Sequence, residues 1–158
     1  MFFMTEPIEY ETAERISNFL LSGHLYLYDN HQLTIPLIVE GIAYPSVRHA
    51  VIGQKALSIG EKVRIATTAL PADLKDYERA LSPPQYWDEQ YVLNCLYLFT
   101  MVKFRRHPDL RKSLVATYPK ELFNGFWKGE GRYDILHTIP VEQNYYGTIL
   151  MEVRKQLL

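Results

Sequence analysis

A long run of helix-forming residues, bounded by prolines, constrains the fold of this chain more than any other feature. Pro83 and Pro84 precede the run and Pro108 follows it, and prolines break or begin helices. The residues between them predict one helix from Tyr86 to Arg106. Its predicted apolar stripe consists of Tyr91, Cys95, Leu98 and Val102, widened by Leu96, Phe99 and Met101. We therefore expect a helix that is buried on most of its sides.

Shorter elements are expected around this helix. Glu40 and Gly41 separate two short apolar segments, which predicts a hairpin. Ser46 is placed to cap the helix that follows it. Helices are predicted at 12–21, at 47–57, from about 71 to before 83, at 108–117 and toward the end of 141–158, whereas 62–68 is ambiguous. The pattern indicates an α+β fold, mainly helical with a small antiparallel sheet, forming a single domain over residues 1–158.

Composition excludes several functional classes. The net charge is -1, so no overall positive field attracts nucleic acid or an anionic membrane. The single cysteine, Cys95, cannot form a disulfide framework or a cysteine metal site. The start of the chain lacks a signal-peptide pattern, and no apolar run is long enough to span a bilayer, so a cytoplasmic location is expected. No dinucleotide, phosphate-loop or zinc motif occurs, so neither a cofactor nor a metal is predicted.

Three local patterns carry residues that suit ligand binding. Arg48 and His49 begin a helix, where an anion is favoured, although a solvated first turn is the preferred explanation of these residues taken alone. Trp87 precedes the long helix, where it can stack on a base, although filling the core is the preferred explanation of this residue taken alone. The glycines of FWKGEGR and QNYYGTILMEVR either let the backbone approach a ligand or simply turn the chain.

In this order and spacing, the three patterns resemble the NADAR family, the YbiA-like proteins. The segment PLIVEGIAYPSVRHAVIGQK, from Pro36 to Lys55, is similar to the family's hairpin and its S-E-H-x-x-Q-A-x-K helix. Trp87 and Lys103-Phe104 match the tryptophan and the K-F helix end. The closing motif N-x-x-G-x-x-L-M-x-x-R corresponds to Asn144, Gly147, Leu150, Met151 and Arg154.

The resemblance implies an N-glycosidase-type protein that acts on, or binds, a ribose-phosphate-linked base. The family's substrates are riboflavin-pathway intermediates and ADP-ribose derivatives, with a link to NAD metabolism. In such a reaction a carboxylate stabilises an oxocarbenium-like sugar or activates water, and an aromatic ring stacks on the base. The implied ligand-binding residues are Arg48, His49, Lys55, Trp87, Trp127, Asn144 and Gly147.

Two departures from the family pattern concern its acids. Arg48 stands where the family has glutamate, and Asn124 and Gly125 occupy the place of an aspartate. The segment that contains these two residues, LFNGFWKGEGR, is shorter than the corresponding segment of the family. We interpret the chain as a divergent copy, of the kind a phage would carry into its host's cytoplasm. A replacement acid would come from Asp88 or Glu130, or else from Glu89, Asp134 or Glu142.

Three functional classes therefore remain open after the sequence. The first is an N-glycosidase that uses a relocated acid. The second is a nucleotide- or ADP-ribose-binding protein that has lost catalysis, with Arg48 holding a phosphate and turnover weak or absent. The third is a protein-interaction module on the same scaffold.

Overall fold

Helices make up most of the part of the chain that can be described. The computed structural model describes residues 10–69, 71–124, 133–134, 139–140 and 144–158. Its helices are α1 (Val47–Lys55), α2 (Ile59–Thr67), α3 (Pro71–Ala80), α4 (Glu89–Arg106), α5 (Pro108–Ala116) and α7 (Tyr145–Leu157), preceded by the short 3-10 helix η1 (Leu25–Leu27). The mainly helical α+β class predicted from the sequence is confirmed.

The strands form short pairs rather than one continuous sheet. The pairs are β2 (Leu37–Val39) with β3 (Ile42–Tyr44), β5 (Tyr133–Asp134) with β6 (Ile139–Pro140), both antiparallel, and β1 (Arg15–Ile16) with β4 (Glu121–Leu122), which is parallel. The predicted hairpin is β2–β3. Its turn residues Glu40 and Gly41 both have positive φ, 51° and 79°, as a two-residue turn between twisted strands requires.

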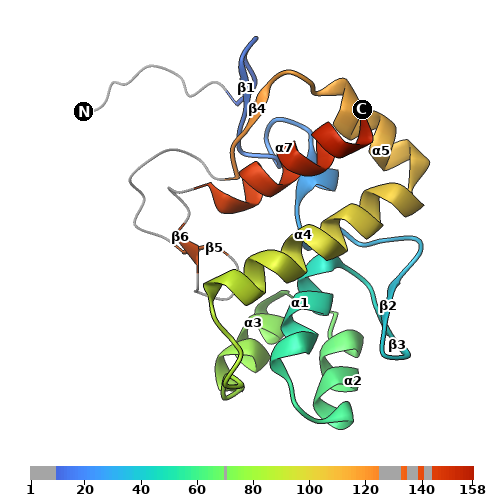
Figure 1. Cartoon of the computed structure of the whole chain (residues 1–158), viewed down its shortest axis with the longest axis vertical. Coiled ribbons are helices and arrows are strands. Elements are labelled where there is room, and N and C mark those ends of the chain that lie inside the picture. The colour runs from blue at the N-terminus through green and yellow to red at the C-terminus, as the bar shows by residue number, and fades with distance from the viewer. Residues whose placement is uncertain (1–9, 70, 125–132, 135–138, 141–143) are drawn as a thin grey trace.

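Helix α4 occupies the middle of the molecule. Figure 1 shows α5 and α7 on one side of it and α1, with α2 and α3 beyond, on the other, and the packing of α4 against α1, α5 and α7 agrees. The fully or largely buried residues of α4 are Val92, Leu96, Phe99, Thr100, Met101, Lys103 and Phe104. A helix between two layers must bury two faces, so its apolar residues form no single narrow stripe.

Two predictions about local structure are wrong. Leu98 is 57% exposed and Cys95 is only partly buried, because burial on α4 follows Val92, Leu96 and Lys103 instead. The helix predicted at 12–21 is absent and β1 lies there. The amide of Glu121 donates to the carbonyl of Glu14, so pairing with β4 takes the backbone groups that a helix would use.

The helix boundaries follow local sequence signals closely. The Ser46 hydroxyl accepts from the His49 amide at the start of α1, and the Asp88 carboxylate accepts from the Tyr91 amide at the start of α4. Ser58 and Glu61 form a reciprocal capping box on α2, which resolves the ambiguous segment as helix. The predicted helices that follow Pro71 and Pro108 are confirmed as α3 and α5.

Lys103 is an ionisable residue placed entirely inside the core. Its side-chain nitrogen donates to the carbonyls of Tyr26 and Tyr28, at 2.7 and 2.9 Å, and so ties α4 to the segment around η1. Burial lowers the pKa of Lys103 to about 7, and the negative charge of Asp29 opposes that shift. The K-F pair of the sequence is therefore a structural anchor in this fold.

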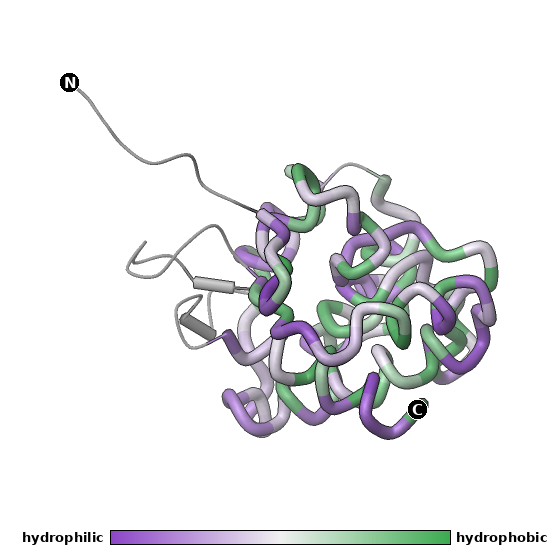
Figure 2. The backbone as a smooth tube through the Cα atoms, turned by 90° about the horizontal axis from the view of Figure 1, so that it is seen from above, coloured by the Kyte–Doolittle hydropathy of each residue, from purple (hydrophilic) through white to green (hydrophobic). Residues whose placement is uncertain are grey.

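Hydropathy is distributed along the chain in short stretches. In Figure 2, hydrophobic and hydrophilic residues alternate along the described helices and loops. Within the described ranges, none of the helices combines the length and apolar character needed to cross a bilayer.

Candidate functional site

Helix α1 carries three of the residues predicted to bind a ligand. Arg48 and His49 lie in its first turn and Lys55 at its end. Arg48 and Lys55 are seven residues apart, which is two helical turns, so they share a face of the helix. The hydrogen bonds and ion pairs of these side chains determine the geometry of the site.

The imidazole of His49 is fixed by two hydrogen bonds. Its Nδ1 lies 2.6 Å from the Ser46 hydroxyl and its Nε2 lies 2.8 Å from the carbonyl of Thr68. Burial lowers the pKa of His49, although the hydrogen bond to Thr68 opposes this. With both ring nitrogens engaged, His49 joins the start of α1 to the end of α2.

Arg48 forms a two-point ion pair with an acid that the sequence did not single out. Its Nε and one terminal nitrogen donate to the two carboxylate oxygens of Asp29, at 2.7 and 3.0 Å. Asp29 is 3% exposed and Arg48 is 33% exposed. The Arg48 amide also donates to the Asp29 carbonyl, so this pair ties α1 to the loop after η1.

Reversing the charge of Arg48 is expected to destabilise the fold. Arg48→Glu would place one carboxylate against the buried carboxylate of Asp29, and we expect the free energy of unfolding to fall by about 1–2 kcal/mol. Solvent screening at the partly exposed Arg48 keeps this value moderate. Urea unfolding measures it. In the double variant Asp29→Asn/Arg48→Glu the repulsion is absent, so most of the loss should be recovered. If the losses in free energy of unfolding from the two single changes simply added in the double variant, the predicted repulsion between the carboxylates would be absent.

Lys55, Glu78 and Trp87 meet where α1, α3 and the segment before α4 come together. The Lys55 ammonium donates to the Glu78 carbonyl at 3.0 Å and to its carboxylate Oε2 at 3.4 Å. The same ammonium lies 6.0 Å from the centre of the Trp87 ring. Lys55 and Glu78 are both more than nine-tenths buried. A cation, an acid and an aromatic ring are thus gathered at one place.

Neighbouring tyrosines hold Trp87 against the end of α1. The hydroxyl of Tyr86 donates to the carbonyl of Gln54 at 3.1 Å, which fixes the segment before α4 onto α1. The ring of Tyr91 contacts both neighbours: its centroid lies 4.8 Å from that of Tyr86 and 5.8 Å from that of Trp87. Trp87 is partly buried, so both core packing and ring stacking remain open to it.

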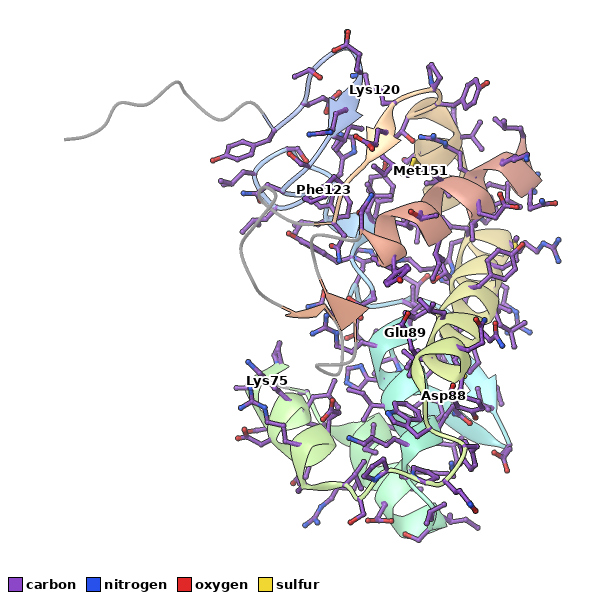
Figure 3. All side chains as sticks on the ribbon, turned by 60° about the vertical axis from the view of Figure 1, so that its left-hand side comes forward. Lys75, Asp88, Glu89, Lys120, Phe123 and Met151 are labelled. Atoms are coloured by element: carbon purple, nitrogen blue, oxygen red, sulfur yellow. The ribbon has the colours of Figure 1, made fainter. Side chains whose placement is uncertain are left out.

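The first turn of α4 adds two acids. Asp88 caps the helix, as described above, and Glu89 is exposed to solvent. Figure 3 shows Asp88 and Glu89 at the start of α4, with Lys75 on α3 at the same end of the molecule and Lys120, Phe123 and Met151 at the other. The start of α4 therefore lies at the same end of the molecule as α3.

Asn144 and Gly147 join α7 to β4. The Asn144 amide donates to the Leu122 carbonyl at 2.9 Å, and its side-chain oxygen accepts from the amide of Asn124 at 2.9 Å. Asn144 has φ 53°, in the left-handed region that asparagine tolerates. A Cβ at Gly147 would collide with the Leu122 carbonyl and the Asn144 side chain. The closing motif therefore has a structural role here.

The structure brings together only part of the predicted set. Lys55 and Trp87 adjoin one another, Arg48 faces Asp29, and Asn144 turns toward β4. Trp127, Glu130 and Glu142 lie outside the described residues, and only the backbone of Asp134 is described. That any residue of the predicted set contacts a ligand stays a prediction. Within the described ranges, no group of three or more His, Cys, Asp or Glu side chains could hold a metal ion.

Two buried acids were missed by sequence reasoning. Asp29 lies in YDNH, a polar segment typical of a turn, where no motif marks it as a partner of Arg48. Glu78 lies on α3 among the polar residues of a short helix, and no motif or spacing marks it. The signal was indirect: a basic residue at an apolar or packed position, such as Arg48 or Lys55, requires an acid nearby.

The fold of this chain is similar to that of a solved structure, and its sequence is similar to that of curated N-glycosidases. The NMR structure of Escherichia coli YbiA matches with a TM-score of 0.71 at 23% identity, over 96% of this chain and 93% of that one. The N-glycosidase YbiA of E. coli K12 is 26% identical over 162 residues, covering 96% of this chain and 94% of the relative. N-glycosidase YbiA of Shigella boydii is 25% identical over the same coverage. No protein-family model matches the chain.

The resemblance predicted from the sequence is thereby confirmed. The chain is a distant match to the curated N-glycosidase YbiA proteins over nearly its whole length, and it shares the fold of E. coli YbiA.

Proposed function

We propose that this protein is an N-glycosidase-type protein that binds a ribose-phosphate-linked base beside Trp87 and cleaves the bond between sugar and base. The observation that carries the proposal is the meeting of Trp87, Lys55 and Glu78. An indole presents a flat apolar face to a base, and a carboxylate stabilises the positive charge that develops on the sugar. The similarity to N-glycosidase YbiA supports this reaction class.

An acid at this place favours hydrolysis over binding alone. A site with only basic and aromatic groups would hold a nucleotide without stabilising an oxocarbenium-like sugar. Arg48 is the proposed partner of a phosphate, in addition to its pair with Asp29. His49 completes the start of α1 as a positioning residue. The ligand is a nucleotide-like small molecule, whether an ADP-ribose derivative or a riboflavin-pathway intermediate.

The test combines a binding screen with product analysis. ADP-ribose, NAD, GMP and phosphorylated riboflavin-pathway intermediates are added in turn, and melting temperature and released base are measured. A ligand at about 100 times its Kd should stabilise the fold by roughly 2.7 kcal/mol. For such a ligand, Trp87→Ala should weaken binding by about 1–3 kcal/mol, the usual worth of one stacked base.

A matched variant separates stacking from packing. Tyr97, partly buried on α4 outside the cluster, is the control, since Tyr97→Ala should leave ligand affinity unchanged. If Trp87→Ala lost stability but bound the ligand as tightly as the wild type, Trp87 would be a core residue and the proposed place of the site would be wrong.

A further inference from the structure

Glu78 is a buried acid whose carboxylate is only half satisfied. It lies near the end of α3 with 4% of its surface exposed. Oε2 is 3.4 Å from the Lys55 ammonium, whereas Oε1 is buried and has no hydrogen-bond partner among the described residues. Leaving a buried carboxylate oxygen without a donor is costly, so such an oxygen calls for a functional explanation.

Lys55 places a proton donor beside that carboxylate. Its ammonium contacts both the carbonyl and the side chain of Glu78, and it lies 6.0 Å from the Trp87 ring centre. The pair is therefore next to the aromatic surface on which a base would stack. The pair links α1 to α3, whereas the segment before α4 is held on α1 by the separate hydrogen bond of Tyr86.

The other acids of this region are already committed or exposed. Both oxygens of Asp29 accept from Arg48, Asp88 caps α4, and Glu89 is exposed to solvent rather than desolvated. Glu61 is used in the capping box of α2. Among the described acids near α1 and the start of α4, Glu78 is thus the one with an unused, desolvated oxygen.

We propose that Glu78 and Lys55 form the acid–base pair of the N-glycosidase reaction, with Glu78 as general base and Lys55 as general acid. The inference rests on the proposed function. The bond between the ribose carbon and the base nitrogen breaks, and its electron pair stays on that nitrogen, which takes a proton from the Lys55 ammonium. Water attacks the ribose carbon and gives its proton to Glu78. Proton transfer from Glu78 to Lys55 then restores both groups.

Glu78→Gln is the variant that tests this role. It keeps the size of the side chain and its hydrogen-bonding capacity but removes the base. We expect ligand affinity to change by less than about threefold and the rate constant of base release to fall at least 100-fold, within the usual range for losing a general base.

A matched control and a conservative variant keep the test informative. Asp76 is exposed on the same helix, and Asp76→Asn should leave the rate constant of base release unchanged. Glu78→Asp retains a carboxylate and should recover part of the activity, which also covers the case in which Glu78→Gln folds poorly.

The outcomes separate the inference from the proposed function. If the wild type releases base and Glu78→Gln releases it at the same rate, the acid–base pair is overturned and the N-glycosidase function stands. Binding by the wild type without any release would overturn the pair and the hydrolysis together, leaving a binding protein. Neither binding nor release with the whole panel would overturn the proposed function itself.

Discussion

Replacing Gly147 by alanine is expected to lower the free energy of unfolding by about 2–3 kcal/mol, at the upper end for overpacking by one methyl group. A Cβ at this position would collide with the carbonyl of Leu122 and with the side chain of Asn144. The carbonyl belongs to β4 and already accepts from Asn144, so neither atom can withdraw without breaking a hydrogen bond. The strain would separate β4 from α7, and urea unfolding measures the loss.

Gly60 offers the control for this experiment. It lies in the first turn of α2, and a Cβ there would meet no atom within 4 Å. Gly60→Ala should therefore leave the protein as stable as before, or stabilise it by up to about 1 kcal/mol through helix propensity. If both variants unfolded at the same urea concentration, the close contact between α7 and β4 would be absent in solution.

The stability of the protein should rise with pH above 7 because of Lys103, whose pKa burial lowers to about 7 from 10.5. Between those two values the unfolded chain holds a proton on Lys103 that the folded chain has released. Unfolding then takes up a proton, so raising the pH disfavours it, with a slope of at most about 1.4 kcal/mol per pH unit. Below about pH 7 this contribution is constant.

Lys103→Met should abolish that pH dependence. The absolute stability of the variant is less diagnostic, because methionine removes a desolvated amine but also leaves the carbonyls of Tyr26 and Tyr28 without their donor. Urea unfolding at pH 7, 8 and 9 measures the slope. Lys75→Met, on the exposed surface of α3, should retain the wild-type slope. A wild type with equal stability at all three pH values would contradict a neutral Lys103.

Local signals in the sequence predicted those parts of the fold that depend on local chemistry. Serine before α1, the prolines that begin α3 and α5, and the glycine of the β2–β3 turn allowed these elements to be predicted, because each acts on the backbone at its own position. The failures were non-local. Pairing with β4, more than 100 residues away, made residues 15–16 a strand, and packing against both α1 and α7 shifted the buried face of α4 away from Leu98.

The candidate site was predictable only in its motif residues. Lys55 and Trp87 were named from the sequence and do adjoin one another. Their partner Glu78 comes from a helix with no motif, and Asp29 from a turn, because an ion pair depends on spatial contact rather than on spacing along the chain. Asn144 was predicted as a ligand contact, and its observed bonds to Leu122 and Asn124 supply a structural reason for its presence.

The two-point pair between Arg48 and Asp29 limits how this protein can have diverged from its relatives. A glutamate at position 48 beside Asp29 would bring two carboxylates together, and an uncharged residue at position 29 would remove the carboxylate that accepts two hydrogen bonds from Arg48. Neither single step is neutral, so the two positions are expected to covary, with an acid appearing at one only when it is lost from the other. An aligned set of YbiA-like sequences should carry that correlation, because selection acts on the pair as one unit.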